Sequence, residues 1–279
     1  MRRQLIINAD DFGLTPGVTE GIIYCSQSGC VTSTSVMVNH LMHQRISVNS
    51  STKDYLGMGV HLNLTSGKPI LPPEDLNTMV KPDGEFIGVD YLFQHPDLVN
   101  IIQVEKEWRA QIIGFLVKFG RPDHLDSHHH IHLLPRFFQV FLQIAEEMRI
   151  PIRFPVLMNE LEGFPSDSLL SGLSNDIAEE MLADDLALLE RSSVRFPDYF
   201  VDDFITPNID QPEKLNEFIQ HLPEGVTEMI CHPGYLDDLL FQVSSYTQIR
   251  VDELKAITAP QLAGLFAHEQ IDLISFGKI

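Results

Sequence analysis

Short apolar segments alternate with amphipathic helical segments along this 279-residue chain. Residues 5–7 form an apolar run that stops at polar residues, and residues 31–39 and 57–64 are rich in β-branched or apolar side chains. Between the first two runs, Thr15 followed by proline is a typical helix start and Gly29 a typical helix stop. Strands alternating with helices build parallel sheets from βα units. The alternation therefore predicts an α/β fold.

The same alternation continues to the end of the chain, with two interruptions. Residues 71–98 are rich in Pro, Gly and Asp and are expected to form a long loop. Residues 157–200 are acidic and loosely helical, and we expect an insertion over one face of a single barrel-like domain that spans residues 1–279. The further predicted elements are helices over 104–119, from Pro135 onward, near 212–221 and over 247–268, and strands over 124–127, 152–156, 229–231 and 272–276.

The charge balance excludes some classes of partner. The chain has 39 acidic and 19 basic residues, a formal net charge of −20. Nucleic acids and anionic membrane surfaces would be repelled, so a neutral or cationic substrate fits better. Three cysteines without a CxxC pair favour a reducing compartment. With no signal peptide and no apolar run of about 20 residues, we expect a cytoplasmic protein.

Asp10 and Asp11 follow directly on the first apolar run. If the strand geometry persists, adjacent side chains point to opposite faces. Two carboxylates beside a core need a cation, a metal ion or hydrogen-bond donors. Taken alone, the pair is better explained by one aspartate that caps the following helix and one that is solvated. A metal site is favoured only when further ligand residues are considered with it.

A histidine-rich segment, HLDSHHHIH, occupies residues 124–132. On a strand, His124, Asp126 and His128 share one face, and neutral imidazoles are good ligands of a divalent metal. The alternative is a surface cluster of histidines. Because the segment lies between a predicted strand and a predicted helix, metal binding is favoured.

Three further residues are candidates only in combination with the aspartates and the histidine segment. His61 lies in GVHLNL, where a histidine is more often a core residue. His232 lies in MICHPGY, where Pro233-Gly234 turns the chain after a strand. Arg153 lies in PIRFPV and is expected to pair with a carboxylate or with a substrate oxygen. The aspartates, both histidines and the 124–132 segment all follow predicted parallel strands, and active sites of α/β barrels assemble at those strand ends.

Five motifs, in order along the chain, make it resemble the YdjC-like carbohydrate deacetylases, a family that includes chitooligosaccharide deacetylases. The motifs are NADDFG (8–13), TSTSVMVN (32–39), GVHLNLTSGKP (59–69), HLDSHHHIH (124–132) and CHPGY (231–235). The resemblance implies a deformed (β/α) barrel of the glycoside hydrolase and deacetylase type. It also implies hydrolysis of acetyl groups from N-acetylated sugars or short oligosaccharides, and a homodimer.

The resemblance also implies roles for individual residues. By motif position, Asp11, His61 and His128 correspond to metal ligands, Asp10 to the catalytic base and His232 to its partner acid. Asp126 and His130 are expected to orient these ligands from behind. The implied metal is Mg²⁺, although two imidazoles and one carboxylate suit Zn²⁺, Mn²⁺ or Co²⁺ better.

Other functions remain open on the same residues. The metal site would also serve another amidohydrolase or a phosphoesterase, but the acidic composition and the lack of a Gly-rich phosphate cradle disfavour phosphate esters. Two histidines and a carboxylate also occur in non-haem iron oxygenases, whose usual all-β framework differs from the βα alternation. A non-catalytic sugar-binding protein on the same barrel would lack a base or an acid, and both are present.

Overall fold

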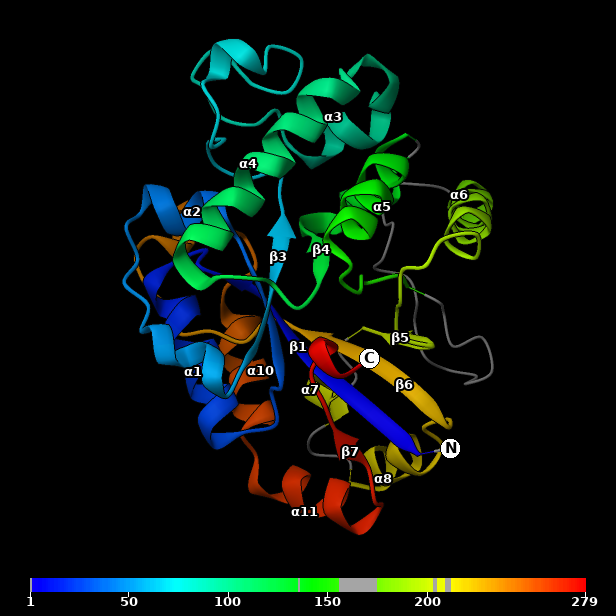
Figure 1. The fold of residues 1–279 in the computed structure, drawn as a ribbon. Coiled ribbons are helices and arrows are strands. Elements are labelled where there is room, and N and C mark those ends of the chain that lie inside the picture. Colours follow the sequence, from blue (N-terminus) through cyan, green and yellow to red (C-terminus); the bar gives the residue numbers. More distant parts are fainter. Residues whose placement is uncertain (1, 135, 156–174, 203–204, 209–211) are drawn as a thin grey trace.

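The computed structural model describes residues 2–134, 136–155, 175–202, 205–208 and 212–279. At its centre is a parallel sheet with the strand order β4-β3-β2-β1-β6-β5, and β7 pairs with β1. Helices surround the sheet (Figure 1). The strands are β1 Arg3–Phe12, β2 Ser33–Val36, β3 Gly57–Leu62, β4 Leu125–Ser127, β5 Tyr199–Val201, β6 Gly225–Cys231 and β7 Asp272–Leu273.

The helices follow the predicted alternation, and the predicted fold class is confirmed. The α-helices are α1 Pro16–Ser28, α2 Val38–His43, α3 Val89–Gln94, α4 Ile101–Phe119, α5 Phe137–Met148, α6 Asn175–Leu189, α7 Ile205–Asn208, α8 Pro212–Gln220, α9 Leu240–Val243, α10 Gln248–Ile257 and α11 Pro260–His268. Short 3-10 helices include η4 His128–Leu133 and η5 Phe276–Lys278. The predicted start of α5 at Pro135 lies outside the described residues.

The sheet is a half-barrel, because beyond β4 the described residues continue it only through an isolated bridge and not through a further strand. The predicted strand over 152–156 is wrong: within 152–155, only Ile152 forms a bridge, to Leu125. The N–H of Ile152 donates to the carbonyl of Arg195, shortly before β5. Prolines 151 and 155 flank this segment, and proline has no N–H to give to a ladder. The ring from β4 toward β5 is therefore continued only by the backbone hydrogen bonds of residues 151–153 among the described residues.

Two predicted segments contain more structure than expected. Residues 71–98, predicted as a long loop, include α3 and a bridge between Val80 and Phe86. The predicted helical stretch over 247–268 is two helices, α10 and α11, because Pro260 disfavours a helical conformation at Ala259. Of the predicted insertion, residues 157–174 lie outside the described residues, and the rest includes α6 and most of β5.

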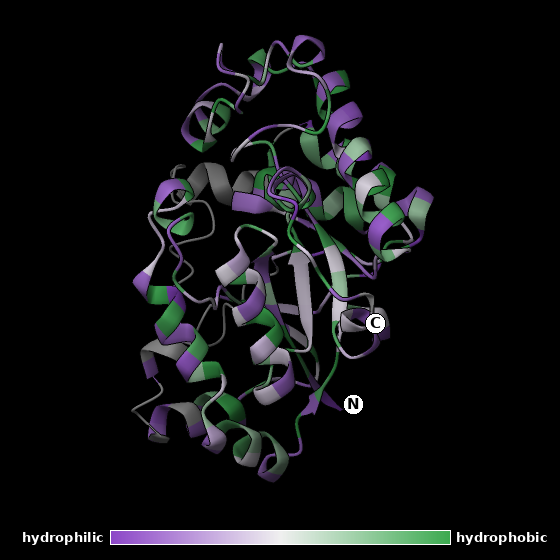
Figure 2. Ribbon diagram, turned by 90° about the vertical axis from the view of Figure 1, so that its left-hand side faces the viewer, coloured by the Kyte–Doolittle hydropathy of each residue, from purple (hydrophilic) through white to green (hydrophobic). Residues whose placement is uncertain are grey.

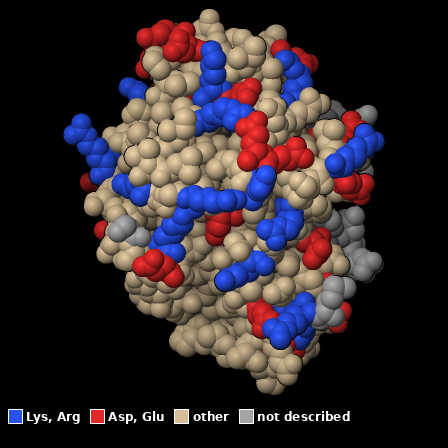
Figure 3. All heavy atoms as spheres, viewed as in Figure 1, with Lys and Arg blue, Asp and Glu red and all other residues tan. Residues whose placement is uncertain are grey.

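The core lies between the sheet and its helices. β1 is buried from Leu5 to Phe12, as expected for a central strand covered on both faces. Hydrophobic and hydrophilic residues alternate along the surrounding helices (Figure 2). Acidic and basic side chains are interspersed on the face in Figure 3. Among the described helices, none is long and apolar enough to cross a membrane.

Candidate metal centre and active site

The predicted site residues meet at one end of the sheet. β1, β3, β4 and β6 run parallel, so their carboxyl ends share one edge. A cavity of about 910 Å³ opens there. It is lined by Asp10 and Asp11 from β1, His61 from β3, and His232, which follows β6. The placement predicted from the strand ends is confirmed.

A bulge in β1 turns both aspartates toward this cavity. The pairing register of β1 with β2 shifts between Ala9 and Phe12, and Asp11 has φ +70°. The condition for side chains on opposite faces, regular strand geometry through both aspartates, is therefore not met. Aspartate tolerates the left-handed region better than most residues, and such strain is concentrated at functional sites. As a result, His61 Nε2 lies 3.8 Å from Asp10 Oδ2 and 3.6 Å from Asp11 Oδ1.

Asp11, His61 and His128 form a group whose ligand atoms lie within 4.8 Å of one another. Among the described residues, the buried Oδ1 of Asp11 has no hydrogen-bond partner, and it lies 3.1 Å from His128 Nδ1. Although burial opposes it, the charges of His128 and Arg250 hold the pKa of Asp11 well below its usual value. An ionised, unsatisfied carboxylate oxygen facing two imidazoles fits a divalent cation.

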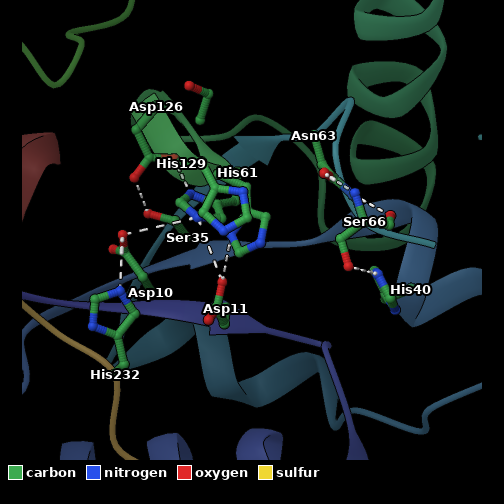
Figure 4. A network of polar contacts seen from close by, with 12 residues as sticks. Asp10, Asp11, Ser35, His40, His61, Asn63, Ser66, Asp126, His129 and His232 are labelled. Carbon is green, nitrogen blue, oxygen red and sulfur yellow. Dashed lines mark hydrogen bonds and ion pairs between the residues drawn. The ribbon is translucent and has the colours of Figure 1, made fainter. Parts of the chain in front are cut away.

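Asp126 supports His61 from behind (Figure 4). Its Oδ1 lies 2.8 Å from His61 Nδ1, and its Oδ2 accepts a 2.5 Å hydrogen bond from Ser35. Residues 61 and 126 are register partners between β3 and β4, so the parallel pairing itself creates this contact. Burial lowers the pKa of His61, but Asp126 and Asp10 outweigh it and raise the pKa to about 9. The contact fixes the imidazole with Nε2 toward the aspartates.

Arg153 is buried behind Asp10, away from solvent. Its two terminal nitrogens donate to both oxygens of Asp10 at 2.8 and 2.7 Å, and its Nε donates to Glu228 at 2.8 Å. The same guanidinium lies 3.1 Å from Asp126. Of the two partners considered from the sequence, the structure shows carboxylates. Although burial raises it, the charges of Arg153 and His61 lower the pKa of Asp10.

His232 approaches Asp10 with its Nε2 4.0 Å from Oδ2. Its loop is docked on α1 through glycines. A Cβ on Gly21 would lie 2.6 Å from the Cα of Gly234, so the two backbones touch and larger residues are excluded. The amide of Tyr235 also donates to the carbonyl of Gly17. The sharp turn predicted at Pro233-Gly234 is wrong, because residues 232–237 form neither a turn nor a bend, and these backbone contacts instead hold His232 at the cavity.

The rest of the histidine segment has divided roles. His129 and His130 both have positive φ, and both line the cavity beside His128. His129 Nδ1 lies 2.9 Å from the Thr65 hydroxyl. His130 packs edge-on against Phe200, and its buried Nδ1 has no hydrogen-bond partner in the part of the chain that is described. No contact tests the predicted support of the ligands by His130.

Sequence reasoning missed the residues of α10 that reach the site. Arg250 donates to Asp11 Oδ2 at 2.6 Å, and Glu253 accepts from the backbone N–H of His232. Both are buried. An arginine and a glutamate three residues apart in a helix usually read as a solvated ion pair. Only their burial distinguishes them, and burial depends on which face α10 presents to the barrel.

Comparisons with known proteins identify relatives of the whole chain. A family model described as YdjC-like protein matches residues 4–268. A carbohydrate deacetylase of Brevibacillus brevis is 33% identical over 278 residues, covering 99% of both chains. One of Clostridium beijerinckii is 31% identical, covering 99% of this chain and 100% of that protein. A crystal structure from Enterococcus faecalis V583, named as a candidate cellobiose-phosphate cleavage protein, has 31% identity and TM-score 0.78, covering 100% and 99%.

An α/β half-barrel with a polar cluster at its strand ends is the class that fold and site define. Within that class, the chain belongs to the YdjC-like family. The family resemblance found in the sequence is confirmed, and the expectation of a carbohydrate deacetylase agrees with the names of these relatives.

Proposed function

We propose that this chain is a metal-dependent deacetylase that removes acetyl groups from N-acetylated sugars or short oligosaccharides during carbohydrate degradation. The observation that carries the proposal is the group of Asp11, His61 and His128 beside Asp10 and His232. It combines three metal-ligating atoms with a carboxylate and an imidazole in one cavity. Such a set suits the hydrolysis of an unreactive amide.

Asp11, His61 and His128 would hold the metal. When bound, the ion supplies a Lewis acid for the amide carbonyl and lowers the pKa of water. Magnesium, implied by the family resemblance, prefers oxygen ligands, whereas two imidazoles and one carboxylate favour Zn²⁺, Mn²⁺ or Co²⁺. We propose a divalent ion of this second group as the better match to the donor set.

Asp10 and His232 would carry the protons. Asp10 is kept ionised by Arg153, so it can accept the proton of the attacking water. Water oxygen bonds to the acetyl carbon and the carbon–nitrogen bond then breaks. His232, on the rim of the cavity, would donate a proton to the departing amine. Arg153, with its nitrogens turned to carboxylates, would orient the base rather than contact the sugar.

The cavity also suits a carbohydrate. Its volume of about 910 Å³ lies near the upper end of the usual range for small-molecule sites, which runs to roughly 1,000 Å³. Among the described residues that line it, Arg250 is the only Lys or Arg, and it is already paired with Asp11. A phosphoesterase would need free cationic donors, so this lining favours an uncharged acetylated sugar over a phosphate ester.

Acetate release from N-acetylglucosamine oligomers tests the proposal. We expect metal-loaded protein to release acetate, and a chelator to abolish the release. Asp10→Asn should lower the rate strongly while the protein still binds metal. A metal-loaded, folded protein that releases no acetate from any oligomer, or an unchanged rate in Asp10→Asn, would contradict the deacetylase mechanism.

We also propose a cytoplasmic location and a homodimer. The three cysteines are buried and free, which fits a reducing compartment. The homodimer depends on the family resemblance alone. Sedimentation equilibrium tests it, and a monomer at micromolar concentration would contradict it.

A further inference from the structure

Each of the adjacent aspartates is held by its own arginine, in a different way. Arg153 donates to both oxygens of Asp10. Arg250 donates only to Oδ2 of Asp11, at 2.6 Å, and Oδ1 stays without a hydrogen-bond partner among the described residues. Both guanidinium groups are buried. The arginines therefore leave one free carboxylate oxygen, and it belongs to Asp11.

Arg250 is itself held rigidly, and it also reaches the loop of His232. Its Nε donates to the carbonyl of Tyr246 at 2.9 Å, and its Nη1 donates to the carbonyl of His232 at 3.3 Å. Its guanidinium carbon lies 5.3 Å from the centre of the Tyr246 ring. Three hydrogen bonds to three different residues use the planar fork of arginine, which lysine cannot reproduce.

One turn further along α10, Glu253 holds the other polar group of the same backbone segment. One of its oxygens accepts from the backbone N–H of His232 and the other from the hydroxyl of Tyr246. The ring of Tyr246 packs edge-on to the His232 ring, with centroids 5.5 Å apart. The N–H and C=O of His232 are thus both bonded to side chains of α10.

We infer that α10 is the positioning element of this site: Arg250 makes Asp11 a one-oxygen metal ligand, and Arg250 with Glu253 holds His232 beside Asp10. The inference rests on the proposed metal site. Neither residue touches the reacting atoms, so both act through others. The same helix thus couples the ligand side and the acid side of the active site.

The charge of Arg250 predicts the direction in which metal affinity changes when this arginine is removed. A buried positive charge beside a ligand carboxylate repels a divalent cation and neutralises part of the carboxylate charge. Removing it frees Oδ2 of Asp11 and makes the site more negative, so the metal should bind more tightly. The same change loosens the His232 carbonyl and should slow turnover. If Arg250 merely stabilised the fold, its loss would weaken metal binding.

The test is a calorimetric titration of metal-free protein with Co²⁺, with acetate release as the second readout. We expect Arg250→Met to bind Co²⁺ at least about fivefold more tightly, through the lost Coulomb repulsion, and to lower kcat at least about tenfold. Arg250→Lys keeps the charge but cannot make three bonds, so Co²⁺ affinity should stay near that of the unaltered protein while kcat falls. Glu253→Gln should lower kcat alone.

Arg109→Met is the matched control, since it removes the same charge from a half-exposed arginine of α4, which pairs with Glu105 and Glu147, and should leave both readouts unchanged. If the unaltered protein binds no Co²⁺, the proposed function fails. If it does bind and a folded Arg250→Met binds equally or less tightly, the inference is overturned. Should Arg250→Met not fold, Arg250→Lys decides: unchanged kcat or altered Co²⁺ affinity overturns the inference.

Discussion

Asp10 and Asp11 are neighbours in sequence, yet their side chains lie in two regions of the site with different hydrogen-bond donors. Asp10 lies toward β4 and β6, where Arg153 occupies both of its oxygens. Asp11 lies toward α10, where Arg250 occupies one oxygen. Asp10 also accepts from Asn8 at 2.7 Å, whereas the neighbours of Asp11 Oδ1 within the described part of the chain are the imidazoles of His61 and His128. Two identical side chains thus differ by one unsatisfied oxygen.

This difference shows how the hydrogen-bond donors around a buried carboxylate decide which chemistry the carboxylate can perform. Three hydrogen bonds from described residues hold Asp10 in place and ionised, and Oδ2 accepts just one of them, so a lone pair stays available for a proton, which suits a base. A carboxylate with a free oxygen still needs a cation, which suits a ligand. The number of donors that each arginine contributes makes the distinction. Changes at either aspartate, either arginine or their surroundings can therefore break or sharpen it.

The largest expected effect separates the two aspartates directly. Asp11→Asn should abolish both Co²⁺ binding and acetate release, because it removes a ligand charge. Asp10→Asn should lower kcat by roughly 10²–10⁴-fold, the usual contribution of a general base, while Co²⁺ affinity stays within about threefold. Calorimetry and acetate release check both. Equal loss of metal binding in the two variants would show that the roles are not divided.

Next in size is the loss of the Asp10 clamp. Arg153→Met leaves the carboxylates of Asp10, Asp126 and Glu228 buried without their shared cation. Breaking a buried ion pair from one side costs about 3–5 kcal/mol, so we expect a loss of this order in the free energy of unfolding. Urea denaturation measures it. The exposed pair of Arg109 is the control and should change stability by less than about 1 kcal/mol on removal; similar values for both would refute the clamp.

The third prediction concerns the pH dependence of stability at Glu228, which shares Arg153 with Asp10. Burial raises the pKa of Glu228 from 4.5 to about 7, despite the charge of Arg153. Since the folded pKa is raised, its contribution to stability is fully present below pH 4.5 and is lost as pH rises through about 7. Glu228→Gln mimics the protonated form and should stabilise the protein by roughly 1–3 kcal/mol at about pH 8, with little effect at about pH 5.

Unfolding of both proteins by urea at the two pH values tests this. An equal difference between Glu228→Gln and the unaltered protein at both pH values would mean that Glu228 does not titrate in this window. Acetate release by the variant is a useful companion measurement, because the bond to Arg153 can still form through the amide oxygen.

The smallest effect involves neither arginine. The Thr15 side chain caps α1 immediately after the aspartates by accepting from the N–H of Val18 at 3.2 Å. Thr15→Ala should cost about 1 kcal/mol of stability, as for other helix caps. Because it removes no contact of Asp10 or Asp11, Co²⁺ affinity should stay unchanged. A shift in Co²⁺ affinity would show that the start of α1 also positions the aspartates.

Much of the fold was predictable because its signals are local. The first apolar run, the cap at Thr15 and the stop at Gly29 each depend on a few neighbouring residues and appear where predicted. The strand predicted over 31–39 is shorter, Ser33–Val36, and α2 begins at Val38. The segment over 152–156 failed because prolines 151 and 155 limit the ladder to one bridge. The break before Pro260 has a local signal too, because proline disfavours a helical conformation in the residue before it.

The site was predictable only in part, for the same reason. The sequence by itself determined that Asp10, Asp11, His61 and His232 meet at one edge, because parallel strands bring their carboxyl ends together. Only the tertiary structure decided which carboxylate oxygen stays free. Arg153 is 143 residues from Asp10, and Arg250 is 239 residues from Asp11. The bulge at Asp11 turns the two aspartate side chains toward these arginines and the cavity. Contacts over such separations leave no local pattern, because they exist only once the sheet and α10 have packed.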